Sequence, residues 1–95
     1  MITAIWSPKA KAQLAECLEW ISKESRSAGT KTIHDVFRAI STISEFPEIG
    51  KYFRLDNTAR VYMVGRKYRI FYRIETERII IDYFQSVKQK TPENP

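Results

Sequence analysis

The stretch RVYMVGRKYRIFYRI, residues 60–74, decides the fold, because apolar and polar side chains alternate through most of it. Alternation with a period of two is typical of a β-strand with one buried face. The dipeptide Gly65–Arg66 interrupts the pattern and is short enough to join two strands as a hairpin. The second strand then has one face with Tyr68, Ile70, Tyr72 and Ile74 and another with Arg69, Phe71 and Arg73. We expect the first face to form the core and the second to be partly open.

Two further strands flank this hairpin in the sequence. RIIIDYF, residues 78–84, follows a short turn at Thr76–Glu77, and ITAIW, residues 2–6, is short, β-branched and aromatic. Between residue 6 and residue 60 the period is helical instead. Ser7 and Pro8 predict the start of a helix over about 8–24, because serine caps helix N-termini and proline fits the first helical position.

A second helical pattern precedes FPEIG, residues 46–50, where Pro47 ends the helix. SRSAGT, residues 25–30, separates the two patterns and predicts a short loop, so the helices should form an αα-hairpin. The side chains expected in the core are Leu14, Cys17, Leu18, Ile21, Ile33, Phe37 and Ile40, packed on Ile70, Tyr72 and Ile81. Tyr68 also lies on the core face.

The predicted fold class is α+β, in the order β-α-α-β-β-β. We expect one domain over residues 1–95, with the helical hairpin on one face of a small antiparallel sheet. Residues 88–95 are polar and contain two prolines, so they are expected to form a tail.

The net charge of +5 lies wholly in the second half of the chain. Residues 1–50 hold six basic and six acidic residues, whereas residues 51–95 hold ten and five. Such an excess favours an acidic or polyanionic partner, with solubility as the alternative explanation. The single cysteine, Cys17, excludes an internal disulfide and favours a reducing compartment. Without a signal-peptide pattern or an apolar run of about 20 residues, we expect a cytoplasmic protein that spans no membrane.

The order of elements, the FPEIG turn, the isolated Arg60 and the segments YRIFYRI and IIIDYF resemble the ParE/RelE superfamily of bacterial type II toxins. The resemblance spans nearly the whole chain. It implies one of two activities: the ParE branch poisons DNA gyrase, and the RelE branch cleaves mRNA on the ribosome. It also implies a hetero-oligomer with an antitoxin encoded beside the toxin. Given the basic sheet half, we expect that antitoxin to have an acidic C-terminal part that is disordered when free.

The resemblance to the RNase branch is incomplete at the residues that would carry the chemistry. Arg69 and Arg60 match the basic positions of the sheet, whereas Tyr62 stands where a second lysine would be expected. Gln89 occupies the position of a C-terminal arginine, flanked by Lys88 and Lys90, and TPENP contains no tyrosine or histidine. General acid–base chemistry on RNA therefore lacks a proton donor, which favours the ParE branch.

Three hypotheses follow: a gyrase-binding toxin, a ribosome-dependent endoribonuclease using Arg60, Arg69, Lys88 and Lys90, and a non-toxic relic that still binds antitoxin. The candidate target-binding residues are Arg60, Tyr62, Arg69, Arg73, Lys88 and Lys90. A structural role competes at each arginine, since Arg69 could pair with an acid such as Asp82. His34 is the single histidine, and no phosphate loop or cysteine cluster is present, so we expect neither metal nor cofactor.

Overall fold

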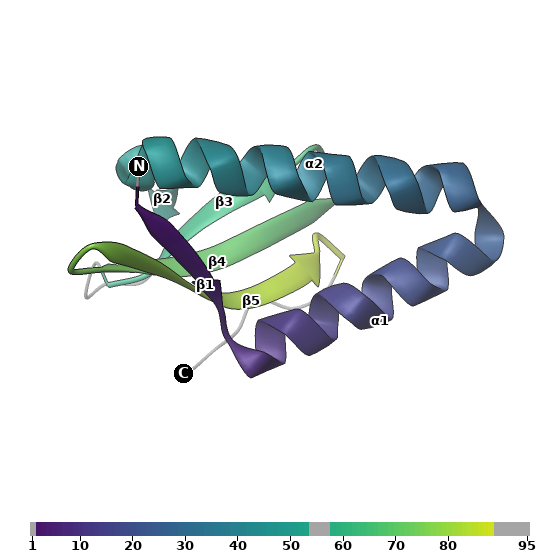
Figure 1. Ribbon diagram of the computed structural model, residues 1–95, viewed down its shortest axis with the longest axis horizontal. Helices are drawn as coiled ribbons and strands as arrows, with labels where there is room; N and C mark the ends of the chain where they lie inside the picture. The colour runs from purple at the N-terminus through teal and green to yellow at the C-terminus, as the bar shows by residue number, and fades with distance from the viewer. Residues whose placement is uncertain (1, 54–57, 89–95) are drawn as a thin grey trace.

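Two long helices cover one face of a five-stranded sheet in the computed structural model, which describes residues 2–53 and 58–88 (Figure 1). The elements in chain order are β1 (Thr3–Trp6), α1 (Pro8–Glu24), α2 (Arg26–Glu45), the 3-10 turn η1 (Pro47–Ile49), β2 (Lys51–Tyr52), β3 (Arg60–Val64), β4 (Tyr68–Glu75) and β5 (Arg78–Ser86). The predicted α+β class and element order are confirmed. The tail expected from residue 88 onward lies, apart from Lys88, outside the described residues.

The strands lie in the order β1-β5-β4-β3-β2, and the sheet is mixed rather than wholly antiparallel. β2, β3, β4 and β5 are joined by antiparallel pairing, whereas β1 pairs parallel with β5. A parallel pair needs a long crossover connection, and here the helical hairpin and the other strands lie between β1 and β5. The two-residue strand β2 was not predicted, because it is too short to show a period.

The helical hairpin has a tighter connection than the sequence predicted. Ser7 caps α1 by accepting a hydrogen bond of 3.0 Å from the amide of Ala10. Ser25 is both the last cap of α1 and the first cap of α2, so the loop expected over residues 25–30 is wrong. Gly29 lies inside α2, where a Cβ would come within 2.4 Å of Ser22 Oγ. The two helices therefore lie close together at Gly29, where a larger residue would require the Ser22 hydroxyl to rotate away.

The core is made by one stripe of each helix and the helix-facing side of the sheet. Its most buried members are Ala10, Val36, Ala39, Ile43, Val64, Ile70, Tyr72, Ile79, Ile81 and Phe84. Ile21 is buried as predicted, and Leu14, Cys17 and Ile40 pack against this cluster while partly exposed. Leu18 and Ile33 are half-buried.

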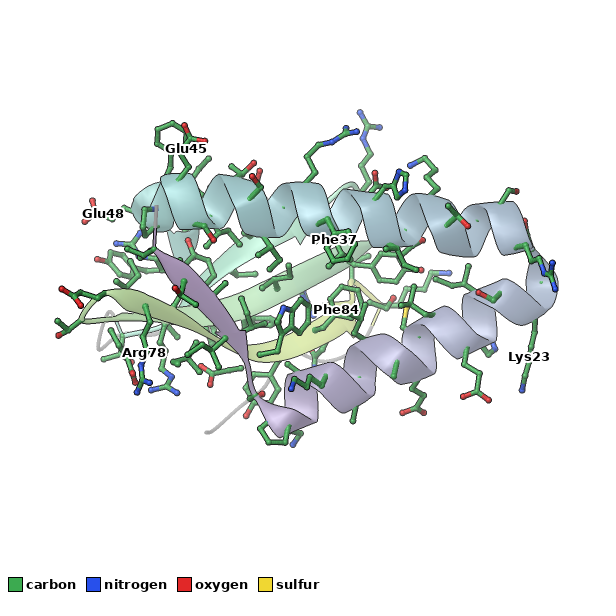
Figure 2. All side chains as sticks on the ribbon, viewed as in Figure 1. Lys23, Phe37, Glu45, Glu48, Arg78 and Phe84 are labelled. Atoms are coloured by element: carbon green, nitrogen blue, oxygen red, sulfur yellow. The ribbon has the colours of Figure 1, made fainter. Side chains whose placement is uncertain are left out.

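Phe37 was predicted to be buried, and this prediction is wrong, because 68% of the residue is exposed. The buried apolar side chains of α2 are spaced by three and four residues, at Val36, Ala39 and Ile43. Phe37 follows Val36 by one position, which turns its side chain about 100° away from the core. Figure 2 labels Phe37 on α2 and Phe84, a buried residue, on β5. Neither helix of the described chain is long and apolar enough to cross a membrane.

Candidate functional site

The sheet divides the predicted target-binding residues between its two faces. Cross-strand partners share a face, and Arg60 pairs with Tyr72 while Tyr62 pairs with Ile70. Tyr72 and Ile70 are fully buried beneath the helices, so Arg60 and Tyr62 belong to the helix side. Arg69 and Arg73 alternate with these buried residues along β4 and therefore belong to the opposite face, called here the open face.

Arg60 is bound to the backbone next to η1 rather than presented to solvent. Its Nη1 donates to the carbonyl oxygens of Glu48 and Gly50 at 3.0 and 2.8 Å, and its Nη2 donates to the Tyr52 hydroxyl at 2.7 Å. Its guanidinium carbon also lies 4.1 Å from the centroid of the Tyr52 ring. These contacts fix the chain after α2 onto the sheet. In this position Arg60 is a structural clamp.

Arg73 is engaged by two carboxylates on the open face. Its Nε and Nη2 donate to the two oxygens of Asp82 at 2.8 and 3.1 Å, and its Nη1 lies 3.3 Å from Glu75. The hydrogen bonds to Asp82 raise the pKa of Arg73 further above its usual value. Asp82 is thus the partner of Arg73, and not of Arg69 as the alternative reading supposed. The charge of Arg73 is balanced locally.

Arg69 lies on the open face, opposite Met63 in the register of β3 and β4. Its guanidinium carbon is 5.5 Å from the centroid of the Phe71 ring. Phe71 is itself buried, because Phe53 and Tyr83 pack against it at centroid distances of 4.8 and 6.1 Å. The open face therefore carries a small cluster of aromatic rings with the Arg69 guanidinium beside it. Phe53 could not be assigned from the sequence, because it lies in an irregular segment.

A groove runs between the helical hairpin and the ends of the central strands, and the sequence did not predict its position. It consists of two adjoining hollows of about 380 and 330 Å³ that share Trp20 and Tyr68. The first hollow is also lined by Glu16, Cys17 and Phe84, and the second by Glu24, Lys31, Asp35, Arg66 and Lys67. Trp20 is 68% exposed despite its size. The sequence signal that could have located the groove is Trp20 itself, a large aromatic residue beside the apolar stripe of a helix.

Two titratable side chains of the groove, Cys17 and Tyr68, have their pKa values raised by burial. Burial raises the pKa of the Cys17 thiol, although a hydrogen bond with Tyr68 acts in the other direction. Burial also raises the pKa of Tyr68 to about 12, with Cys17 adding to the effect. Both groups are therefore neutral near pH 7, and the thiol is a poor nucleophile. Cys17 and Tyr68 are therefore not suited to nucleophilic or acid–base chemistry near neutral pH.

Of the predicted residues near the C-terminus, the structure describes Lys88 only. Lys88 is exposed just after β5, and its amide donates to Ser86 Oγ at 3.2 Å. Gln89 and Lys90 lie outside the described residues. Across residues 2–53 and 58–88, no three histidine, cysteine or acidic side chains are grouped as metal ligands would be.

Comparison with known proteins agrees with this fold. A family model described as "ParE toxin of type II toxin-antitoxin system, parDE" matches residues 4–89. Among solved structures, a chain of the "Chromosomal ParDE TA system from P. aeruginosa" superposes with a TM-score of 0.75 at 16% identity. The match covers 93% of this chain and 98% of that one, and at this identity it speaks for the fold alone. A comparison with curated protein sequences gives no significant match.

Proposed function

We propose that this chain, which belongs to the ParE toxin family of type II toxin–antitoxin systems, inhibits DNA gyrase by protein–protein binding and is neutralised by a cognate antitoxin. The competing function in the superfamily is cleavage of mRNA on the ribosome. The observation that favours gyrase binding is the separation of Arg60 from Arg69 by the sheet.

Cleavage of RNA needs cations that converge on one phosphate and hold its developing charge at hydrogen-bond distance. Arg60 already donates to the carbonyl oxygens of Glu48 and Gly50 on the helix side. Arg69 is on the open face, and Arg73 there is held by Asp82 and Glu75. Among the described residues, these arginines do not form a common phosphate site.

The open face has the composition of a protein-binding surface. Met63 is 46% exposed and pairs with Arg69 across β3 and β4. Methionine and arginine are both enriched in protein interfaces, where a few such residues carry most of the binding energy. We therefore assign the gyrase contact to the open face around Met63 and Arg69.

The groove at Trp20 is assigned to the antitoxin. It offers apolar surface from Trp20 and Tyr68 above the buried Phe84, which fits the apolar face of an amphipathic helix. Arg66 and Lys67 at one end of the groove favour acidic residues in that part of the helix, whereas Glu16 and Glu24 on the α1 wall favour basic ones. A disordered segment that folds into an amphipathic helix on binding matches the apolar lining, with its acidic residues placed at Arg66 and Lys67.

Two assays in parallel test the activity. Purified protein is added to gyrase with relaxed plasmid, and separately to translating ribosomes with mRNA. The proposal expects loss of supercoiling with intact mRNA, and a weaker effect for Arg69→Ala. Codon-positioned cuts in mRNA together with normal supercoiling would overturn it in favour of the RNase. Inactivity in both assays, with antitoxin binding retained, would identify a relic.

The antitoxin assignment is tested with two variants of equal exposure. Trp20 and Phe37 are each 68% exposed, but only Trp20 lines the groove. Loss of a central aromatic anchor typically costs about 2 kcal/mol or more, so Trp20→Ser should weaken antitoxin binding about 30-fold. Phe37→Ser should change it less than about threefold. Equal effects of the two variants would remove the groove from the interface.

A further inference from the structure

An apolar hollow lies at the other end of α2, where η1 meets the β4–β5 hairpin. It has a volume of about 590 Å³ and is lined by Glu45, Phe46, Pro47, Glu48, Ile49 and Ile74. Phe46, Ile49 and Ile74 are 58%, 46% and 40% exposed. Neighbouring exposed apolar side chains of this size are typical of a site that binds another molecule.

The backbone beneath this hollow is held in place by side chains from the sheet. The hydroxyl of buried Tyr72 donates to the carbonyl oxygen of Pro47 at 2.6 Å and accepts from the amide of Gly50 at 2.9 Å. Arg60 adds its bonds to the carbonyl oxygens of Glu48 and Gly50. The apolar side chains are therefore presented by a fixed backbone. A preformed surface loses little conformational entropy when a partner docks.

The charge around the hollow is the opposite of the net charge of the chain. Glu45 and Glu48 lie near the same end of α2, as Figure 2 shows, and within the described chain neither has an ion-pair partner. Glu45 is in the last turn of α2, which contains no basic residue. A carboxylate there is unfavourable, because the C-terminal end of a helix dipole is already negative. The charged side chains that line the hollow are therefore both acidic, while the Arg60 guanidinium lies beneath it at the carbonyl oxygens of Glu48 and Gly50.

We propose that this hollow is a docking site for a partner segment with an apolar side chain flanked by lysine or arginine. The apolar lining would take the apolar group, while Glu45, Glu48 and the end of α2 attract the cations. An acidic antitoxin segment would be repelled here, so the hollow is distinct from the groove at Trp20. The groove reaches Asp35 on α2 and the hollow begins at Glu45, so about 15 Å of helix separates the two surfaces. The proposal does not depend on gyrase being the target.

The test uses two synthetic peptides with the same apolar residues, one flanked by lysines and one by glutamates. Amide chemical shifts of the ¹⁵N-labelled protein are followed during titration with each. The lysine peptide should shift the resonances of Phe46, Glu48, Ile49 and Ile74 and should weaken as salt is added. The glutamate peptide should leave them unchanged. Equal binding of both peptides, shifts confined to the Trp20 groove, or no shifts at millimolar peptide would each overturn the proposal.

Charge variants make the test specific. Glu45→Lys combined with Glu48→Lys should weaken the lysine peptide about tenfold or more, because two rim attractions become repulsions. Glu16→Lys combined with Glu24→Lys changes the net charge equally but lies at the groove, so it should alter affinity less than about twofold. If the two double variants behave alike, the effect is one of net charge and the site is refuted. Resonance shifts that depend on protein concentration alone would instead indicate a second copy of this chain as the occupant.

Discussion

The hydroxyl of Tyr72 and the carbonyl oxygen of Pro47 are joined by a hydrogen bond of 2.6 Å, although 25 positions separate the two residues. Tyr72 is fully buried in the centre of the sheet, and Pro47 begins the turn that follows α2. The same hydroxyl accepts from the amide of Gly50. One phenol thus connects the end of the helical hairpin to the core and satisfies two backbone groups at once.

Tyr72→Phe should destabilise the protein by about 1–3 kcal/mol. The ring would still fill the core, but the carbonyl oxygen of Pro47 and the amide of Gly50 would lose their partner while partly or fully buried. The measurement is the free energy of unfolding in urea. Tyr62→Phe is the matched control on β3, and a change within about 0.5 kcal/mol is expected for it. Equal costs for the two variants would show that the bonds of Tyr72 contribute little.

Two substitutions in α2 test the core assignment. Ile43 is fully buried, so Ile43→Ala should cost about 2–5 kcal/mol through lost burial and the cavity left behind. Phe37 is 68% exposed, so Phe37→Ala should change stability by less than about 0.5 kcal/mol. Urea midpoints of the two variants give the comparison. A larger loss for Phe37→Ala would mean that α2 is rotated from the position described.

Most of the fold could be predicted because apolar residues recur along the sequence with clear helical or alternating spacing. The change from helical to alternating apolar positions located both helices and the strands from residue 60 onward. What could not be predicted depends on tertiary contact. SRSAGT contains small residues for a close helix crossing at Gly29, not for a loop. The parallel pairing of β1 depends on β5 lying next to it, more than 70 residues later in the chain, and no local sequence pattern predicts such a long-range contact.

The candidate site was harder to predict because it depends on register. A two-residue turn at Gly65–Arg66 would pair Val64 with Lys67 and put Arg60 on the same face as Arg69. In the structure the turn has three residues and Gly65 adopts φ of 61°, so Val64 pairs with Tyr68. That shift of one residue moves Arg60 to the helix side. Both hairpins are compatible with the composition of the turn, so alternation alone could not choose.

Glu77→Gly should stabilise the protein by up to about 1 kcal/mol. Glu77 connects β4 and β5 with φ of 63°, a left-handed conformation that costs a residue with a Cβ about 1–2 kcal/mol. Glycine avoids most of that cost but loses some entropy on folding. A rise of about 4–8 °C per kcal/mol in the melting temperature is expected for a domain of this size. Thr76→Gly, at a neighbouring position without positive φ, should lower it instead.

Alkaline conditions should unfold the protein partly through Tyr68. Burial raises the pKa of Tyr68 from its usual 10 to about 12, so between these values the folded state holds a proton that the unfolded state has lost. The free energy of unfolding should be fully retained below pH 10 and should fall as the pH rises toward 12. Tyr68→Phe removes this titration and should flatten the decline of the urea midpoint over that interval. An unchanged slope in the variant would contradict the assignment.

Arg60 and Arg69 should separate stability from activity. Arg60→Ala removes the hydrogen bonds to Glu48, Gly50 and Tyr52, so it should cost about 1–3 kcal/mol in unfolding free energy. Arg69→Ala should weaken gyrase inhibition about tenfold or more, because arginine is a frequent anchor of protein interfaces. Urea unfolding and supercoiling assays on both variants provide the test, with Arg78→Ala as an exposed-arginine control. If Arg60→Ala abolished inhibition while leaving stability unchanged, Arg60 would belong to the target surface and not to the clamp.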